Sequence, residues 1–460
     1  MKNKSKMFAY LVFFLVVFTA CENSEPQPNI ILILTDDQGW TDSSVPMIKD
    51  REDSKSDFYE TPNLERLAKD GLVFSSAYAP APVCTPTRYS ILYGKTPAKL
   101  RHATLKNWNA TPPENETSIP KMIKSANSKY KTAHFGKWHQ SLTPSDVGYD
   151  ESDGPTGNGE GDWIKPGLQK NPDSDPKRTF GISNRACEFI SESVSKDNPF
   201  FMQVSYYAVH VQNYGLESTK EKYRNKKPGK KSTPRDFELP APPLNQGMIS
   251  YAAMVEDLDT GFGMILDKLD ELGITENTYV IFTSDNGGFS GVSDCRPLRE
   301  SKGHLYEGGI RVPMIVRWPG RVKAGTLSDE PVVSMDFYPT FLEVAGLKPD
   351  TGKPLDGESL VSLFQQTGKP KREALFFHFP NYAWHMGNRL GGAVRSGNYK
   401  LIRNYDDRSL ELYDLRADLS ETKNLAKQRP RLAKRLDQKL AAWLKETGAK
   451  MPKPPKPSGQ

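Results

Sequence analysis

Three stretches of the chain are apolar at nearly every position rather than at every second one. They cover residues 30–34, 199–209 and 279–282. A strand that is buried on both faces shows such a run, and sheets covered by helices on both sides contain such strands. Helical patterns lie between these runs, at 63–70 and 254–272. The alternation of strands and helices predicts an α/β fold whose central strands are parallel.

Polar side chains follow each of the three runs. Asp36 and Asp37 come after the first, His210 ends the second, and Asp285 and Asn286 come after the third. A single acid at such a position is as often a turn former or a helix cap as a ligand. Its recurrence favours a binding site, because open α/β sheets bind ligands at the carboxyl ends of their strands. Donors that are all oxygen favour Ca²⁺ or Mg²⁺ over zinc or copper, and a neutral amide suits the less regular shell of Ca²⁺.

The pattern changes after Pro313. Residues 332–346 predict a capped helix that ends at a glycine. Ala393–Asn404 and Leu410–Leu415 alternate on either side of a polar turn and predict a hairpin. A basic amphipathic helix is predicted at 430–446, before a proline-rich tail that we expect to be disordered. We therefore expect a large domain at 29–375, a C-terminal subdomain at 376–450 and a tail at 451–460.

The first 28 residues have the pattern of an export signal. A lysine-rich start precedes an apolar run, Met7–Phe18, which is too short for the roughly 20 residues of a membrane span. The run leads to Ala20-Cys21 and so resembles a bacterial lipoprotein signal at 1–20, with Cys21 as the lipidated residue and a polar tether at 21–28. We expect a lipid anchor in the outer membrane, at the cell surface or on the periplasmic face. Plain secretion is the alternative.

Composition and charge narrow the function classes. The chain is 37% hydrophobic and 10% aromatic, as in globular proteins, with a formal net charge of +6. Part of that charge lies in a lysine-rich stretch at 220–231, which is either a solvated loop or a groove for a polyanion. Nucleic acid is not an expected partner of an exported protein.

The cysteines beyond the signal are too few for a disulfide framework. Cys84, Cys187 and Cys295 are an odd number, so at most one disulfide can form. Pairing Cys187 with Cys295 is the only arrangement that leaves Cys84 free. We expect both to be buried thiols instead.

Cys84 opens the stretch Cys84-Thr85-Pro86-Thr87-Arg88. This stretch resembles the signature of type I sulfatases of the alkaline phosphatase superfamily, Cys-x-Pro-Ser/Thr-Arg. In that family the cysteine is oxidised during export to Cα-formylglycine. The resemblance therefore implies that Cys84 is an aldehyde precursor, and that a formylglycine-maturation enzyme acts on the chain.

Further stretches match the same family in the same order. They are Asp36-Asp37, the Gly-Lys-Trp-His core of a second signature at 136–139, Asp285-Asn286-Gly287, and Lys302–Pro313. The family's later histidine falls on His210. The second signature departs from the usual pattern at Lys129 and at Gln140-Ser141, and Val211-Gln212 replaces the commoner continuation after His210. The resemblance extends from Asn29 to about Leu425.

The resemblance implies a fold and a set of site residues. The fold is alkaline-phosphatase-like: a large, mostly parallel mixed sheet between helices, followed by a small antiparallel sheet with one helix. The implied ligands of Ca²⁺, in preference to Mg²⁺, are Asp36, Asp37, Cys84 as formylglycine, Asp285 and Asn286. The implied catalytic residues are Cys84, Arg88, Lys137, His139, His210 and Lys302.

The family mechanism gives these residues distinct roles. Arg88, Lys137 and Lys302 would neutralise the sulfate ester together with the cation. One hydroxyl of hydrated formylglycine would attack sulfur, and the other would later expel sulfate. His139 would help to deprotonate this diol, and His210 or Lys302 would protonate the departing alcohol oxygen.

We therefore expect a sulfatase that removes sulfate from sugars. The expected substrates are oligosaccharides of an algal polysaccharide, such as a carrageenan-type galactan or ulvan, or of a host glycosaminoglycan. Polar and aromatic residues of the C-terminal subdomain are candidates for sugar contacts: His378, Asn381, Tyr382, His385, Asn388 and Arg389. Two alternatives stay open, a formylglycine-dependent phosphonate or phosphodiester hydrolase and a noncatalytic surface glycan-binding protein on a sulfatase scaffold.

Overall fold

The computed structural model describes residues 27–101, 116–161, 172–227, 229, 244–347, 354–382 and 387–452. The expected signal segment, Cys21, His385 and the tail beyond Pro452 lie outside these residues. Within the described part of the chain, no helix combines the length and the apolar character that a membrane span requires.

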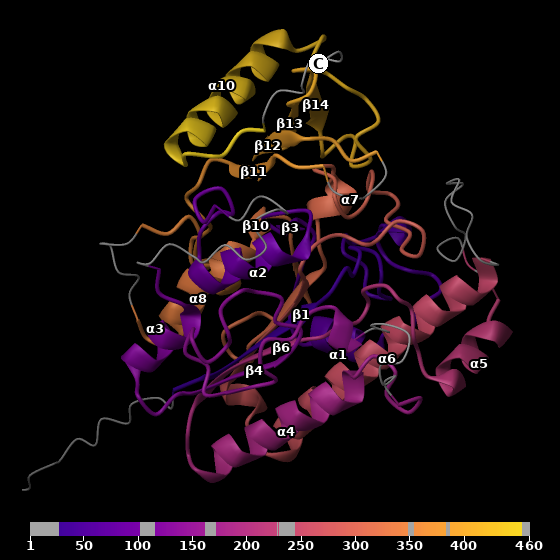
Figure 1. The fold of residues 1–460 in the computed structure, drawn as a ribbon, viewed down its shortest axis with the longest axis vertical. Coiled ribbons are helices and arrows are strands. Elements are labelled where there is room, and N and C mark those ends of the chain that lie inside the picture. The colour runs from indigo at the N-terminus through magenta and orange to yellow at the C-terminus, as the bar shows by residue number, and fades with distance from the viewer. Residues whose placement is uncertain are drawn as a thin grey trace, which may run out of the picture.

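An eight-stranded sheet forms the centre of the larger part of the molecule (Figure 1). Its strands lie in the order β5 (Glu151–Ser152), β4 (Lys131–Gly136), β6 (Phe200–Ser205), β1 (Asn29–Thr35), β7 (Thr278–Ser284), β8 (Met314–Arg317), β2 (Leu72–Phe74) and β9 (Thr326–Ser328). β8 is antiparallel to β7 and β2, and the other neighbours are parallel. The predicted α/β fold with a mostly parallel sheet is confirmed.

Helices cover both faces of this sheet, which is why its central strands are apolar at every position. Ile31 and Ile33 point to the face that is covered by α1 (Pro62–Lys69), α4 (Thr179–Ser195) and α6 (Leu244–Glu271). Ile30 and Leu32 point to the other face, covered by α2 (Cys84–Tyr93), α3 (Ile119–Ala126) and α8 (Phe337–Val344). The long helix α6 begins well before the predicted start at 254.

Short elements complete the large part. They are η1 (Glu52–Ser54), β3 (Ala77–Tyr78), η3 (Gly159–Gly161), α5 (Glu217–Asn225), η5 (Thr275–Asn277), α7 (Glu307–Ile310), β10 (Val332–Val333), η6 (Ser334–Asp336) and α9 (Val361–Phe364). The helix predicted at 332–346 is wrong at its start, because β10 pairs with β3 before η6 and α8 begin. Gly346 lies just beyond α8 with φ = 79°, a left-handed conformation that favours glycine.

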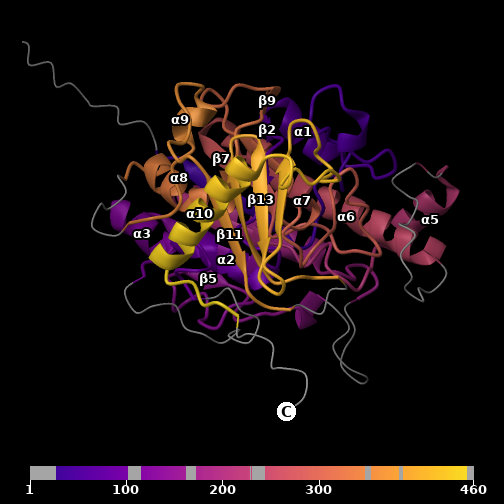
Figure 2. The same ribbon diagram turned by 90° about the horizontal axis from the view of Figure 1, so that it is seen from above.

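The C-terminal part is a four-stranded antiparallel sheet with one helix (Figure 2). Its strands are β11 (Leu375–Phe379), β12 (Gly391–Ser396), β13 (Tyr399–Asn404) and β14 (Leu410–Asp414), and α10 (Pro430–Glu446) packs on one face. The other face contributes Phe377 and Ile402 to a cluster shared with Leu305 and Ile310 of the large part. The predicted hairpin is β13–β14, and a turn at Gly397 divides the segment 393–404 into two strands.

The cysteines and the basic stretch are also placed. Cys84, Cys187 and Cys295 are all free thiols, so Cys187 and Cys295 do not pair. Cys295 is buried as expected, but Cys187 on α4 is only half-buried. In the described part of the basic stretch, Lys222 and Lys226 pair with Glu60, and Arg224 pairs with Glu217. These pairs favour a solvated helix over a groove for a polyanion.

Buried His134 on β4 predicts how stability depends on pH. Burial and the charge of Arg88 lower the pKa of His134 from 6.5 to about 3. The folded state therefore keeps the ring neutral at a pH at which the unfolded chain takes up a proton. The stabilising contribution is complete above about pH 6.5 and is lost as the pH falls toward 3.

We expect a His134→Gln variant to lose less stability on acidification than the wild type. Between pH 7.5 and 5, the wild type should lose about 2 kcal/mol more of its unfolding free energy than the variant does. Urea unfolding of both proteins at the two pH values measures this difference. Equal losses in the two proteins would contradict the assignment to His134.

Candidate active site

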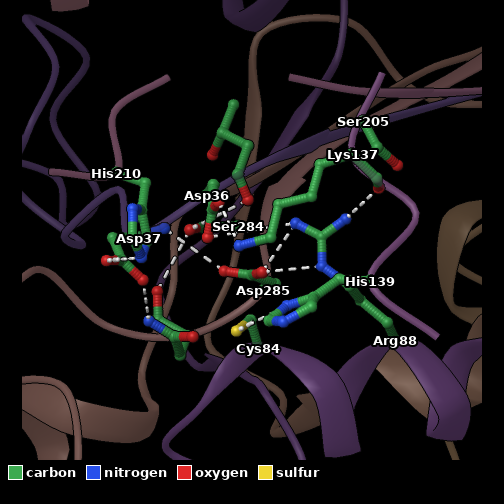
Figure 3. Close-up of polar contacts among 12 residues, drawn as sticks. Asp36, Asp37, Cys84, Arg88, Lys137, His139, Ser205, His210, Ser284 and Asp285 are labelled. Atoms are coloured by element: carbon green, nitrogen blue, oxygen red, sulfur yellow. Dashed lines mark hydrogen bonds and ion pairs between the residues drawn. The ribbon is translucent and has the colours of Figure 1, made fainter. Parts of the chain in front are cut away.

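The register of three strands brings the predicted strand-end residues together. Thr35 of β1 lies beside Ser284 of β7, and Leu34 lies beside Ser205 of β6. The residues that follow these strands therefore meet at one edge of the sheet. Figure 3 shows that the side chains of Asp36, Asp37, Asp285 and His210 converge there, above the N-terminus of α2.

Asp36 and Asp37 each pair with a buried lysine. Lys137 Nζ binds Asp36 Oδ2, and Lys302 Nζ lies 2.6 Å from Asp37 Oδ1. Burial alone would raise the pKa of both carboxyls, but these lysines and nearby cations hold both pKa values below the usual range. Asp37 has φ = 61°, a conformation that costs energy in a residue other than glycine and that is common at functional sites.

Cys84 is the first residue of α2, and its side chain is 4% exposed. Its Sγ lies 3.4 Å from His139 Nδ1, which also lies 3.3 Å from Thr85 Oγ1. Burial would raise the pKa of the thiol, but Lys137 and Lys302 lower it below its ordinary value. Thr85 was not among the predicted site residues, although its place beside Cys84 in the signature could have signalled it.

Arg88 lies one helical turn after Cys84 and is 1% exposed. Its Nε and Nη2 donate to Asp285 Oδ2 at 3.0 and 2.7 Å. Its Nη1 donates to the backbone oxygen of Lys137 at 2.7 Å. The guanidinium thus connects α2 to the residues that follow β7 and β4, and it is buried rather than exposed to solvent.

The Gly-Lys-Trp-His core places a lysine and a histidine at the site. A Cβ on Gly136, which has φ = 93°, would lie 2.0 Å from the backbone oxygen of Ser205, so only glycine fits. The next residue, Lys137, donates its backbone N–H to that same oxygen at 2.7 Å. Burial, with Lys137 and Arg88, holds the pKa of His139 well below its usual range. His139 is therefore neutral near pH 7.

Close backbone packing fixes the loop that carries Lys302. The backbone N–H of Lys302 donates to Gly288 at 2.9 Å, and that of Gly303 donates to Pro82 at 2.8 Å. A Cβ on Gly308 would lie 2.0 Å from the backbone oxygen of Glu300. Gly308 thus lets the start of α7 pack closely against the backbone of Glu300.

His210 follows β6, as its place in the sequence predicts. Its Nε2 lies 3.8 Å from Asp37 Oδ2, too far for a hydrogen bond, and its side chain is 10% exposed. The structure thus brings together every residue that the resemblance implied for catalysis or for metal binding.

The oxygen atoms at the site fit a divalent cation. Asp36 Oδ1 and Asn286 Oδ1 are buried and have no hydrogen-bond partner in the structure as described. Asp36, Asp285 and Cys84 each offer a ligand atom within 4.8 Å of the others, and so do Asp36, Asp37 and His210. Burial and repulsion from Asp36 raise the pKa of Asp285 to about 7, against the lowering effect of Arg88. A bound cation would relieve this repulsion and satisfy both unpartnered oxygens.

The candidate sugar contacts are mostly engaged elsewhere. His378 is 3% exposed and bonds to Tyr405 and to the backbone of Lys450, so its proposed sugar contact is wrong. Asn388 donates to the backbone of Gly303, and Arg389 pairs with two aspartates of the β13–β14 turn. Asn381 is half-buried, and Tyr382 is 63% exposed. His385 lies outside the described residues.

Comparison with known proteins identifies the family. Residues 28–347 match the family model described as Sulfatase, and residues 301–447 match one described as N-sulphoglucosamine sulphohydrolase, C-terminal. A protein of Formosa agariphila named Sulfatase is 31% identical over 98% of this chain and 96% of its own. The N-acetylgalactosamine-6-sulfatase of Rattus norvegicus is 30% identical over 82% of this chain and 71% of its own.

A solved structure agrees with this result. The crystal structure of Ps i-CgsB in complex with k-i-k-neocarrahexaose has a TM-score of 0.75 and 26% identity, and the match covers 91% of this chain and 93% of that one. The sulfatase relatives favour sulfate ester hydrolysis over the phosphonate and noncatalytic alternatives. The chain belongs to the sulfatase family and is a sulfuric ester hydrolase.

Proposed function

We propose that this sulfatase hydrolyses sulfate esters with a formylglycine made from Cys84. The observation that carries the proposal is the position of Cys84, at the N-terminus of α2, 3.4 Å from His139 and grouped with Asp36 and Asp285. Formylglycine, once hydrated, would supply an oxygen nucleophile and a second hydroxyl at this position. Cys84 is a buried free thiol, and it lies beside the polar side chains of His139, Asp36 and Asp285.

The surrounding residues can hold the sulfate ester and move its protons. Arg88, Lys137 and Lys302 are fixed cations in a site that is closed to water, where fixed charge acts strongly on an anion. His139 Nδ1 lies 3.4 Å from the side chain of Cys84, close enough to take a proton from the group at that position. His210 lies on the opposite side of the carboxylates (Figure 3), where it could protonate the departing alcohol oxygen.

We further propose that Asp36, Asp37, Asp285 and Asn286 hold Ca²⁺ rather than Mg²⁺. Support comes from the all-oxygen donor set and from the neutral amide, which an irregular shell tolerates. When bound, the ion would polarise the sulfate oxygens as a Lewis acid. The lysines paired with Asp36 and Asp37 would keep these carboxylates ionised and oriented for the ion.

Removal of the ion should lower both activity and stability. We expect dialysis against a chelator to reduce kcat by at least about tenfold and to lower Tm by several degrees, because crowded carboxylates then repel one another. Added Ca²⁺ should restore both values, and Mg²⁺ should restore them less well. Full activity and an unchanged Tm in the chelated protein would contradict the proposed site.

As substrates we propose oligosaccharides of a carrageenan-type galactan. The solved relative in complex with k-i-k-neocarrahexaose supports this choice. Fragments of ulvan and of glycosaminoglycans are the alternative substrates. The deciding experiment measures sulfate release from defined sulfated oligosaccharides of all three classes by the matured protein. Release from carrageenan fragments alone would support the proposal, and release from another class alone would replace it.

We also propose that the mature protein is anchored to the bacterial outer membrane through a lipidated Cys21. The lysine-rich start, the short apolar run and Ala20-Cys21 support this localisation. Membrane fractions of cells that produce wild type or a Cys21→Ser variant test it. Equal membrane retention of the two proteins would contradict lipid anchoring.

A further inference from the structure

A buried cluster of charged side chains joins the large part to the C-terminal sheet. Its members have side chains that are no more than 7% exposed: Tyr78, Glu307 and Arg311 from the large part, and Arg395, Lys400 and Glu421 from the C-terminal part. None of them ranks among the residues that the sequence suggested for catalysis. The cluster lies directly after the loop that carries Lys302.

Glu307 is at the centre of the cluster. Its Oε2 accepts hydrogen bonds from Tyr78 Oη at 2.7 Å and from Arg311 Nη1 at 2.9 Å. Its Oε1 accepts from Lys400 Nζ at 2.9 Å, and this bond crosses to strand β13. The carboxylate therefore depends on a cation from the C-terminal sheet for one of its two oxygens.

Glu421 forms a second link across the same boundary. Its Oε2 accepts the backbone N–H of Glu307 at 2.7 Å, at the start of α7. Its Oε1 lies 3.0 Å from Lys400 Nζ, so one lysine holds both carboxylates. The C-terminal part thus contacts the side chain of Glu307 through Lys400 of β13, and its backbone through Glu421, which follows β14.

These bonds hold one end of the loop from Lys302 to Glu307, and other bonds hold its first end. At its first end the loop bonds to Gly288 and Pro82, next to the metal ligands and to Cys84. At its other end it bonds to Lys400 and Glu421. Between the two ends, Lys302 Nζ lies 2.6 Å from Asp37. Both ends of the loop are thus held by residues of both parts, since Asn388 of the C-terminal part also donates to the backbone of Gly303.

A lysine shared by two buried carboxylates cannot be removed without a local response. Without Lys400, Glu307 would keep Arg311 as a cation, but Glu421 would lose the cation that faces it in a region closed to water, where unpaired charge is costly. We expect the start of α7 to move away from Glu421 in response. Such a movement would displace the loop and, with it, the ammonium group of Lys302.

We propose that Lys400 and Glu421 are positioning residues. They act from the C-terminal part to hold the loop so that Lys302 stays beside Asp37 in the active site. The inference rests on the role proposed above for Lys302 in sulfate ester hydrolysis. It makes the C-terminal part a component of the active site, although neither Lys400 nor Glu421 is placed against the substrate.

A double-mutant cycle tests the proposal. Wild type, Lys400→Met, Lys302→Ala and the double variant are compared on an aryl sulfate, with kcat expressed per mole of protein converted at residue 84. We expect Lys400→Met to lower kcat by about 10- to 100-fold with KM changed less than about threefold, because displacement of a catalytic group costs rate. The double variant should be within about twofold of Lys302→Ala, because Lys400 acts through Lys302.

A matched control separates positioning from general damage. Arg403 on β13 pairs with Asp437 on α10, a contact inside the C-terminal part, on the face of the sheet that α10 covers. Arg403→Gln should lower Tm without lowering kcat. Lys400→Arg, which keeps the charge, should recover most of the rate that Lys400→Met loses.

Glu421→Gln keeps the proposal testable if Lys400→Met does not fold, because glutamine still accepts the backbone N–H of Glu307. It should lower kcat in the same direction and should also add nothing to Lys302→Ala. Wild-type kcat in the folded variants, or effects that multiply in the double variants, would overturn the inference while the proposed function stands. A wild-type protein that releases no sulfate would overturn the proposed function and this inference with it.

Discussion

Cys84→Ala is expected to reduce kcat on an aryl sulfate by at least about 10³-fold, because it removes the side chain proposed to form the nucleophile. The fold should survive, since a small apolar side chain replaces another at the first position of α2. Tm should therefore stay within a few degrees of the wild-type value. Steady-state kinetics and a thermal melt on the same preparations measure both quantities.

A control and a trapping variant sharpen this test. Cys187→Ala removes a half-buried free thiol on α4 and should leave kcat unchanged. Cys84→Ser has only one hydroxyl and should accumulate protein that carries one sulfo group, which intact mass detects. Wild-type rates from Cys84→Ala, with Cys187→Ala equally active, would refute the assignment of the nucleophile.

Asp285→Ala is expected to abolish measurable turnover and also to destabilise the protein. The substitution removes a proposed metal ligand and both carboxylate hydrogen bonds of Arg88, whose guanidinium is 1% exposed. A buried charge left without its partner costs about 3–5 kcal/mol, partly offset here by relief of repulsion from Asp36. Urea unfolding measures the loss of stability, and sulfate release measures the loss of turnover.

Asp285→Asn separates the two effects. The amide keeps an oxygen acceptor for Arg88 but loses the negative charge that a cation needs. We expect this variant to lose less stability than Asp285→Ala and nearly as much activity. If Asp285→Asn kept wild-type turnover without added metal, the carboxylate would not be a ligand.

Much of the site could be predicted from the sequence because its residues lie in short stretches. Asp36 and Asp285 directly follow apolar strands, and parallel strands bring their carboxyl ends to one edge of the sheet. Cys84 and Arg88 are one helical turn apart, which places them on one face of α2. For Cys84 and Arg88 the spacing along the chain determines the spacing in space, whereas Asp36 and Asp285 meet because β1 pairs with β7.

Other features could not be predicted locally. Val332 and Val333 fall within the predicted helix but form a strand that pairs with Ala77 and Tyr78. These partners lie far away in the chain, so the local pattern does not reveal the strand. His378 is a candidate for a sugar contact in the sequence, but in the structure it bonds to Tyr405 and Lys450. These bonds depend on how β11 packs, which the local sequence does not show. The contacts among Glu307, Lys400 and Glu421 also join distant parts of the chain, so no local pattern predicts them.

The sequence by itself determined the α/β class and the strand-end carboxylates, since apolar periodicity and short motifs encode local structure. Its resemblance to the family also singled out Cys84 as the proposed nucleophile precursor. Only the tertiary structure decided which cation faces which carboxylate, that Cys187 and Cys295 do not pair, and that the C-terminal sheet supports the Lys302 loop. These outcomes depend on contacts between residues far apart in the chain. Their energies come from burial and from the distance between charges, which no local pattern contains.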